Sequence, residues 1–261
     1  MFDDPRMSLA VEIAREAGRI ALEYFRSGSY QVDRKPDLSP VTAADRRAEE
    51  MLRQRIEEKF SDDAILGEEY GQSAGNSGYR WILDPIDGTK SFISGVPLFG
   101  TLVGLQKDGE NIGGVIEIPA LDQRIFALRD QGAWYQSGSE REVVQAGVSQ
   151  CQQLSEGLLL TSEFEGWAER GVTDLLWQLE KKAWFTRTWG DCYGYLMVAT
   201  GRAVLMVDPV MNLWDAAAVQ PILEEAGGTF TDWQGNATAD GGEGIGTNGK
   251  VLEEVLEVLR P

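Results

Sequence analysis

The sequence predicts an α/β protein with an α+β first lobe and an α/β second lobe. Two stretches with apolar residues at helical spacing open the chain. Short apolar runs separated by turn residues follow, and they indicate an antiparallel or mixed sheet. The second half alternates between strand and helix patterns, which is typical of an α/β layer. A chain of 261 residues is long enough to form two packed lobes.

The first predicted helix covers residues 8–26, where apolar residues recur on one helical face. Because this pattern begins directly after Met7, we take Met7 as a candidate start of the chain. Residues 30–41 are polar and contain Lys35, Pro36 and Pro40, so we expect a loop there.

The second predicted helix carries its apolar stripe over residues 41–60. Thr42 followed by Asp45 has the form of a capping box at its start. Five strands are then expected, over residues 63–67, 80–84, 99–106, 112–118 and 123–129.

A boundary between lobes is expected in the polar residues 136–150, which lack a clear pattern, and we divide the chain into residues 1–140 and 141–261. The second lobe has strand patterns over residues 157–161, 203–207 and 230–233, and helix patterns over residues 171–182, 191–200, 214–226 and 248–259. Pro221 would cost about 3 kcal/mol inside a helix, so we expect a kink or an overriding tertiary contact there. The glycine-rich residues 240–246 are expected to form a loop.

Composition excludes several classes of function. The net charge of −18 argues against a nucleic acid or an anionic membrane as partner and suits a protein that binds cations. The two cysteines, Cys151 and Cys192, cannot build a disulfide framework, and the first residues do not resemble a signal peptide, so we expect a cytoplasmic protein. No apolar run approaches transmembrane length. The chain has no histidine, so acid–base chemistry must come from other side chains or from metal-bound water.

The segment from Trp81 to Phe92, WILDPIDGTKSF, is the most informative part of the chain. A buried strand ends in two carboxylates, Asp84 and Asp87, and Gly88 and Thr89 then begin a helix. Oxygen ligands beside free backbone N–H groups favour a site for Mg²⁺ and phosphate. The alternative is that the two aspartates only form a turn and a cap.

Two further acids stand at the ends of predicted elements. Glu68 follows the strand at residues 63–67, and Asp215 lies in the first turn of the helix at residues 214–226. As alternatives, Glu68 is a surface acid and Asp215 is a charge that favours the helix dipole. The apolar neighbours of Asp215 would make an unpaired carboxylate costly, so a cation is expected beside it.

Four motifs occur together in this chain: GEE at residues 67–69, WILDPIDGT at 81–89, WDAA at 214–217 and EAGG at 225–228. In type and order they resemble the inositol monophosphatase superfamily, whose members are Mg²⁺-dependent phosphatases. The resemblance implies a layered αβαβα sandwich, a site where two lobes meet and two or three Mg²⁺ ions. It also makes a homodimer the expected assembly.

The resemblance implies a role for each matching residue. The metal ligands would be the side chains of Glu68, Asp84, Asp87 and Asp215 and the backbone carbonyl of Ile86. Gly88 and Thr89 would hold the phosphate by backbone N–H groups. Thr89 and Asp45 would orient and deprotonate the attacking water, together with the metal ligand Glu68 as a catalytic residue. Asp45 is thus expected either to cap its helix or to assist catalysis. Lys35 falls near a loop lysine of the family.

The segment WGDCYGY at residues 189–195, together with Asp208, resembles the histidinol-phosphate phosphatases of the superfamily, which act in histidine biosynthesis. Asp191 and Asp208 would face the cationic groups of L-histidinol phosphate, and Tyr193 or a tryptophan would lie against its ring. The alternatives are that Asp191 caps a helix and that Asp208 belongs to a turn before Pro209.

The expected function is therefore hydrolysis of a small phosphate ester that is cationic away from its phosphate. One alternative is an inositol-1-phosphate or broad-specificity sugar-phosphate phosphatase. The other is a catalytically inactive relative that binds metal. The presence of all four ligand carboxylates and of Thr89 argues against the inactive relative.

Overall fold

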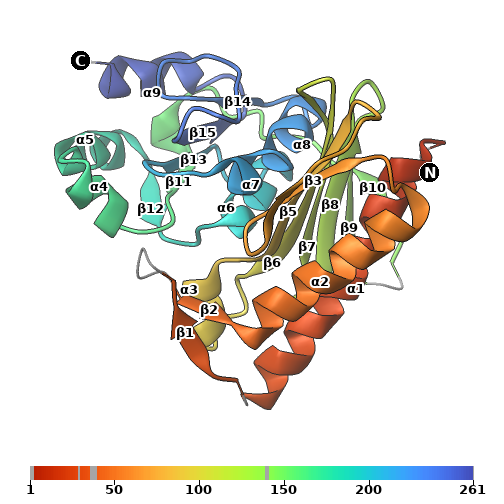
Figure 1. The fold of residues 1–261 in the computed structure, drawn as a ribbon. Coiled ribbons are helices and arrows are strands. Elements are labelled where there is room, and N and C mark those ends of the chain that lie inside the picture. Colours follow the sequence, from red (N-terminus) through yellow and green to blue (C-terminus); the bar gives the residue numbers. More distant parts are fainter. Residues whose placement is uncertain (1–2, 29, 36–39, 139–140, 261) are drawn as a thin grey trace.

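The computed structural model describes residues 3–28, 30–35, 40–138 and 141–260, and Figure 1 shows their arrangement. A pair of helices covers an eight-stranded sheet, and a central group of helices separates this sheet from a five-stranded sheet. Further helices cover the outer face of the second sheet. The predicted layered α/β fold is confirmed.

Helices α1 (Pro5–Ser27) and α2 (Ala43–Lys59) pack side by side against one face of the large sheet (Figure 1). Asp4 caps α1 by accepting hydrogen bonds from the N–H groups of Arg6 and Met7. The helix therefore begins before Met7, whose side chain is fully buried, and the prediction that it starts after Met7 is wrong. The sequence signals for this start are Asp4 at the cap and Pro5 in the first turn.

The loop expected over residues 30–41 contains two short strands. β1 (Val32–Arg34) and β2 (Pro40–Thr42) pair antiparallel and lead directly into α2. The part of the predicted loop at residues 36–39 lies outside the described residues. The pairing brings Lys35, at the end of β1, close to the large sheet.

The eight-stranded sheet confirms the expected mixed pairing. Its order is β10-β9-β8-β7-β6-β5-β3-β4, and β3 and β5 form its parallel pair. The strands are β3 (Ala64–Gly67), β4 (Gly71–Ser73), β5 (Tyr79–Asp87), β6 (Gly100–Lys107), β7 (Glu110–Ile118), β8 (Gln123–Leu128), β9 (Ala133–Ser137) and β10 (Val144–Gln145). The five expected strands are present. The short strands β4, β9 and β10 were not expected. β10 lies beyond residue 140 and still pairs with β9, and the division of the chain at that residue stays a prediction.

The five-stranded sheet has the order β12-β11-β13-β15-β14. Its strands are β11 (Leu158–Leu160), β12 (Phe185–Arg187), β13 (Leu205–Asp208), β14 (Thr229–Thr231) and β15 (Gly244–Thr247). The prediction of a loop through residue 246 is wrong, because β15 is a buried strand between β13 and β14. A Cβ atom on Gly246 would lie 2.7 Å from Leu223 and 2.8 Å from Tyr195, so this glycine permits close packing of helices against the sheet.

The remaining helices are α3 (Thr89–Ile93), which lies beside β2, the 3₁₀ turn η1 (Leu154–Glu156), α4 (Glu165–Glu169), α5 (Thr173–Lys182), α6 (Cys192–Ala199), α7 (Leu213–Ala216), α8 (Val219–Glu225) and α9 (Leu252–Leu259). Helices α6, α7 and α8 lie between the two sheets, and α4, α5 and α9 lie outside (Figure 1). Among the described residues, no helix is long and apolar enough to cross a membrane.

Two helix predictions need correction. The single helix expected over residues 214–226 is divided into α7 and α8, and Pro221 is the third residue of α8. The first N–H groups of a helix have no partner within it, so proline is tolerated there without the interior penalty. The helix expected from Asn248 begins at Leu252, because Asn248 Oδ1 instead accepts hydrogen bonds from the N–H groups of Lys250 and Val251 in a preceding turn.

Candidate metal and phosphate site

Three carboxylates from β5 and α7 converge where β5 ends. Asp84 and Asp87 belong to β5, and Asp215 lies in α7. One oxygen from each lies within 4.8 Å of the other two. The pairing of β5 with β6 is irregular between Asp84 and Asp87, which fits an interposed Pro85. The two aspartates thus lie within the strand, and the alternative of a simple turn is wrong.

The electrostatics of this cluster favour a bound cation. Asp84 is buried, and its Oδ1 has no hydrogen-bond partner among the described residues. Burial and the nearby carboxylates of Glu68, Asp87 and Asp215 raise the pKa of Asp84 well above its ordinary value. Burial, with Asp191 and Asp215, does the same to the pKa of Asp87. Buried carboxylates that lack a counter-charge are costly, so these residues fit a metal ion.

Asp215 caps α7 and also contributes to the cluster. Its Oδ2 accepts hydrogen bonds from the Asn212 backbone N–H at 2.7 Å and from Asn212 Nδ2 at 3.3 Å. Burial raises the pKa of Asp215 to about 7 despite these bonds. The predicted place of Asp215 in the first turn of a helix is confirmed, and the same side chain still offers an oxygen to Asp84 and Asp87.

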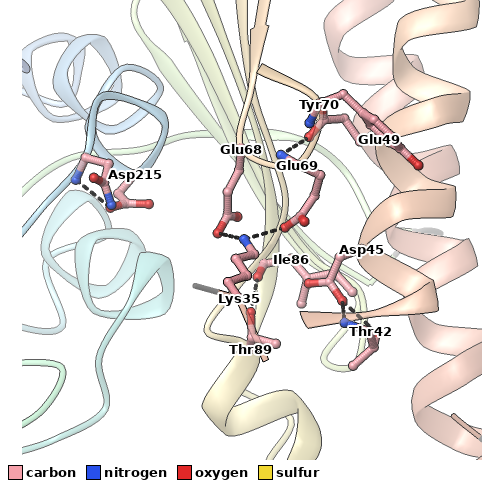
Figure 2. A network of polar contacts seen from close by, with 11 residues as sticks. Lys35, Thr42, Asp45, Glu49, Glu68, Glu69, Tyr70, Ile86, Thr89 and Asp215 are labelled. Atoms are coloured by element: carbon pink, nitrogen blue, oxygen red, sulfur yellow. Dashed lines mark hydrogen bonds and ion pairs between the residues drawn. The ribbon is translucent and has the colours of Figure 1, made fainter. Parts of the chain in front are cut away.

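Glu68 lies at the end of β3 and is paired with Lys35. Figure 2 shows Lys35 Nζ between two carboxylates, 2.6 Å from Glu68 Oε1 and 2.7 Å from Glu69 Oε1. Burial raises the pKa of Glu69 to about 7. Burial alone would lower the pKa of Lys35, but the two carboxylates outweigh it and raise the pKa overall. Lys35 therefore supplies a fixed positive charge beside the predicted metal ligand Glu68.

The predicted water-activating residues make separate contacts. Thr89 Oγ1 donates a hydrogen bond to the Ile86 carbonyl at 3.1 Å (Figure 2). Asp45 Oδ2 accepts from the Thr42 backbone N–H at 2.8 Å and from Thr42 Oγ1 at 2.6 Å, so the predicted capping box is confirmed. Both bonds use Oδ2. Burial raises the pKa of Asp45. No hydrogen bond joins Thr89 to Asp45 in the part of the chain that the structure describes, and their joint role stays a prediction.

A backbone contact links α6 to the cluster. The N–H of Cys192, the first residue of α6, donates a hydrogen bond to Asp87 Oδ2. The orientation of Asp87 is therefore fixed by α6. Asp215, in α7, is the third carboxylate of the cluster.

A pocket of about 460 Å³ lies beside the carboxylates, and its lining includes Glu68, Asp87, Gly88, Thr89, Asp191, Asp208 and Asp215. Asp191 has a backbone conformation that is rare for a residue with a side chain, with φ 52° and ψ −153°. Its side chain makes no capping hydrogen bond, so the capping alternative is wrong. Burial, with repulsion from Asp208 and Glu163, raises the pKa of Asp191 to about 7.

Asp208 lines the same pocket but is held by the protein. Its Oδ1 accepts from the Ser162 N–H at 2.9 Å, and its Oδ2 accepts from the Tyr195 hydroxyl at 3.0 Å. Burial raises the pKa of Asp208 to about 6. Asp208 is the last residue of β13, and its hydrogen bond with Tyr195 connects that strand to α6. It therefore does more than form a turn before Pro209.

Tyr193, which was predicted to contact the substrate, does not line this pocket. Its ring instead lies 5.7 Å from the Arg202 guanidinium. Tyr195 lines the pocket, and the sequence contains a signal for it, because residues four apart share a helical face and Asp191 precedes Tyr195 by four. Glu163 and Ser162 also line the pocket, and they were missed because they lie in a loop without periodicity.

Comparison with known proteins identifies the family of the chain. A family model described as the inositol monophosphatase family matches residues 3–260. The chain belongs to this family. The resemblance inferred from the four motifs is confirmed, as is the expectation of a phosphomonoesterase. Because the family is metal-dependent, the acidic cluster is also consistent with its chemistry.

Individual members of the inositol monophosphatase family resemble the chain over most of its length. A histidinol-phosphatase from Chlorobaculum parvum is 44% identical over 241 residues, which are 92% of this chain and 91% of that protein. A histidinol-phosphatase from Mycobacterium tuberculosis is 37% identical and covers 97% of each chain. Among solved structures, an inositol monophosphatase from Zymomonas mobilis is 31% identical with a TM-score of 0.84 and covers 98% of each chain. One from Thermotoga maritima is 27% identical with a TM-score of 0.86, and it covers 98% of this chain and 97% of that one.

Proposed function

We propose that this phosphatase hydrolyses L-histidinol phosphate to L-histidinol and phosphate, with Mg²⁺ as its cofactor. The observation that carries the choice of substrate is Asp191. Its carboxylate is half-buried, lines the pocket, makes no cap and stands on a strained backbone. Strain of this kind costs roughly 1–3 kcal/mol and is commonly found at functional sites.

The metal would be held by oxygen ligands, which Mg²⁺ prefers. Glu68, Asp84, Asp87 and Asp215 supply carboxylates, and Ile86 supplies a carbonyl. We infer two or three ions from the number of these ligands and from the family. When bound, Mg²⁺ supplies Lewis-acid stabilisation of the phosphate and a water of lowered pKa.

The residues of the chain would position the reactants. Gly88 and Thr89 would donate backbone N–H groups to the phosphate. The Thr89 hydroxyl and the Asp45 carboxylate would orient the attacking water and accept its proton. Asp45 has its Oδ2 committed to Thr42, so this role would use its other oxygen.

The acidic wall of the pocket supports a cationic substrate. Asp191, Asp208 and Glu163 all line it, and the carboxylates repel one another. The ammonium and imidazole groups of L-histidinol phosphate would relieve that repulsion, whereas inositol offers no charge away from its phosphate. Because both oxygens of Asp208 already accept hydrogen bonds, Asp191 is the better candidate for direct contact.

A second candidate substrate is inositol 1-phosphate. Structural similarity to inositol monophosphatases from Zymomonas mobilis and Thermotoga maritima supports it. The relatives at 37–44% identity are histidinol-phosphatases, and they favour the first substrate.

An Asp191→Asn variant tests the choice of substrate. We expect kcat/KM for L-histidinol phosphate to fall at least about tenfold, since a hydrogen bond to a charged group contributes about 1.5–3 kcal/mol. The rate with myo-inositol 1-phosphate should change little, and it controls for damage to the metal site. An equal fall for both substrates would remove Asp191 as a cation contact.

Other expectations remain proposals. We infer a homodimer from the family, a cytoplasmic location from the cysteine content and a small phosphorylated molecule as the partner. The charge of −18 argues against nucleic acid or an anionic membrane as a further partner.

A further inference from the structure

A buried carboxylate outside the predicted ligand set contacts the turn that carries Glu68. Glu49 lies in α2, and its side chain is fully buried. Its Oε2 accepts a hydrogen bond from the Glu69 N–H at 2.8 Å, and its Oε1 accepts from the Tyr70 N–H at 3.2 Å. Figure 2 shows these contacts beside Glu68. One side chain of α2 therefore binds the two backbone amides that follow Glu68.

Arg53 extends the contact to the rest of the β3–β4 hairpin. It donates to Glu49 Oε1 at 2.8 Å, one helical turn away, and to the Ser73 hydroxyl at 3.0 Å. It also donates to the Gly71 carbonyl. Glu49 and Arg53 together connect α2 to the hairpin by four hydrogen bonds, and a fifth joins the two side chains to each other.

The glycine before Glu68 permits this approach. A Cβ atom on Gly67 would lie 2.0 Å from Glu49 Oε1, which no side chain tolerates. The glycine that begins the GEE motif is thus required for a steric reason that is separate from metal binding. It leaves room for the Glu49 carboxylate against the backbone of the hairpin.

We propose that Glu49 is a positioning residue for the metal ligand Glu68. By fixing the amides of residues 69 and 70, it directs the Glu68 side chain toward the cluster of Asp84 and Asp215. Lys35 binds the Glu68 carboxylate from one side. If the turn were free to move, this ion pair could draw Glu68 away from the cluster. Asp45 lies four residues before Glu49 on the same face of α2. The helix therefore fixes the position of Asp45 relative to the turn that carries Glu68. This inference rests on the proposed metal site.

The test is Mg²⁺ binding by the metal-free protein, measured by isothermal titration calorimetry without substrate. In Glu49→Gln the amide keeps one acceptor oxygen and turns an NH₂ group toward a backbone donor. Changes to residues that orient metal ligands typically cost 10–100-fold in affinity, and we expect a rise in Kd of about that size. Saturating Mg²⁺ should restore kcat to near the wild-type value, which a general loss of structure would not allow.

The matched control is Glu50→Gln, the neighbouring residue of the same helix. Glu50 is exposed and accepts a hydrogen bond from the Tyr70 hydroxyl at 2.6 Å, so it touches the same turn without binding its backbone. We expect its Mg²⁺ affinity and activity to equal those of the wild type. If Glu49→Gln does not fold, Glu49→Asp keeps the charge and shortens the reach, and the same rise in Kd is expected.

The outcomes separate the two proposals. A folded Glu49 variant with the Mg²⁺ Kd of the wild type overturns the positioning role and leaves the metal site intact. A wild-type protein that binds no Mg²⁺ overturns the metal site and this role together. A raised Kd in the Glu49 variants, with an unchanged Kd in Glu50→Gln, supports both.

Discussion

At Asp84 the needs of stability and of metal binding conflict. The carboxylate is buried, one of its oxygens has no partner among the described residues, and three other acids surround it. Such a group destabilises the metal-free fold and suits a residue that binds a cation. The WILDPIDGT segment predicted this role because carboxylates at the tip of a buried strand have few structural reasons to be there.

Asp84→Asn should separate these two effects. We expect phosphate release to fall below about 1% of the wild-type rate, since the amide cannot supply the charge on which metal-assisted hydrolysis depends. The free energy of unfolding of the metal-free variant, from urea denaturation, should equal or exceed that of the wild type. Normal turnover would show that Asp84 is not a metal ligand.

Tyr195 illustrates what residue patterns missed. The buried hydroxyl donates to Asp208, and this contact depends on where β13 lies relative to α6, which the sequence does not encode locally. Tyr193 is also aromatic and is two residues from Asp191 in the sequence, but it does not line the pocket. Helical periodicity would have favoured Tyr195, but only with the knowledge that Asp191 faces the pocket.

Tyr195→Phe should lower the free energy of unfolding by about 1–3 kcal/mol, because it leaves a buried carboxylate oxygen of Asp208 without its donor. The measurement is urea denaturation at pH 7.5 with EDTA. Tyr193→Phe is the matched control, and it should change the free energy by less than about 0.5 kcal/mol. Equal stability of the two variants would contradict the contact.

At the scale of elements, local signals placed most strands and helices. Thr42 and Asp45 marked the start of α2, and the apolar runs marked β5 to β8. The failures occurred where tertiary packing overrides local preference. Gly246 suggested a loop by composition, but it lies in β15 because helices of the central layer pack against that strand.

Pro221 gives a prediction for the break between α7 and α8. It occupies the first turn of α8, where its missing N–H costs nothing, so Pro221→Ala should not relieve strain. We expect the free energy of unfolding to fall by up to about 1 kcal/mol, because alanine increases the entropy of the unfolded chain. A gain of about 3 kcal/mol by thermal or urea denaturation would show instead that proline interrupts a continuous helix.

At the scale of the molecule, elements far apart in the chain contribute acids to one site, and in the metal-free protein these carboxylates repel one another. Asp191 and Asp215 have a pKa of about 7, and Asp84 and Asp87 are also raised. A carboxyl group whose pKa is higher in the folded state binds its proton more tightly there. Its contribution to stability is therefore greatest below the unfolded pKa of about 4 and is lost as pH rises toward about 7.

The metal-free protein should accordingly have a higher Tm at pH 5.5 than at pH 7.5. Mg²⁺ competes with protons for these carboxylates, so it should raise the Tm more at pH 7.5 and reduce the difference. Differential scanning calorimetry with EDTA and with Mg²⁺ measures both values. A Tm of the metal-free protein that increases over this range would contradict the proposed cluster.

The most direct test of the account is phosphate release from L-histidinol phosphate and from myo-inositol 1-phosphate, measured in parallel with Mg²⁺ and with EDTA. We predict release that requires Mg²⁺ and a clear preference for L-histidinol phosphate, because the pocket that adjoins the metal ligands is acidic. Equal or reversed preference would contradict the role of the acidic wall in substrate choice. Release that persists in EDTA would contradict the metal site itself.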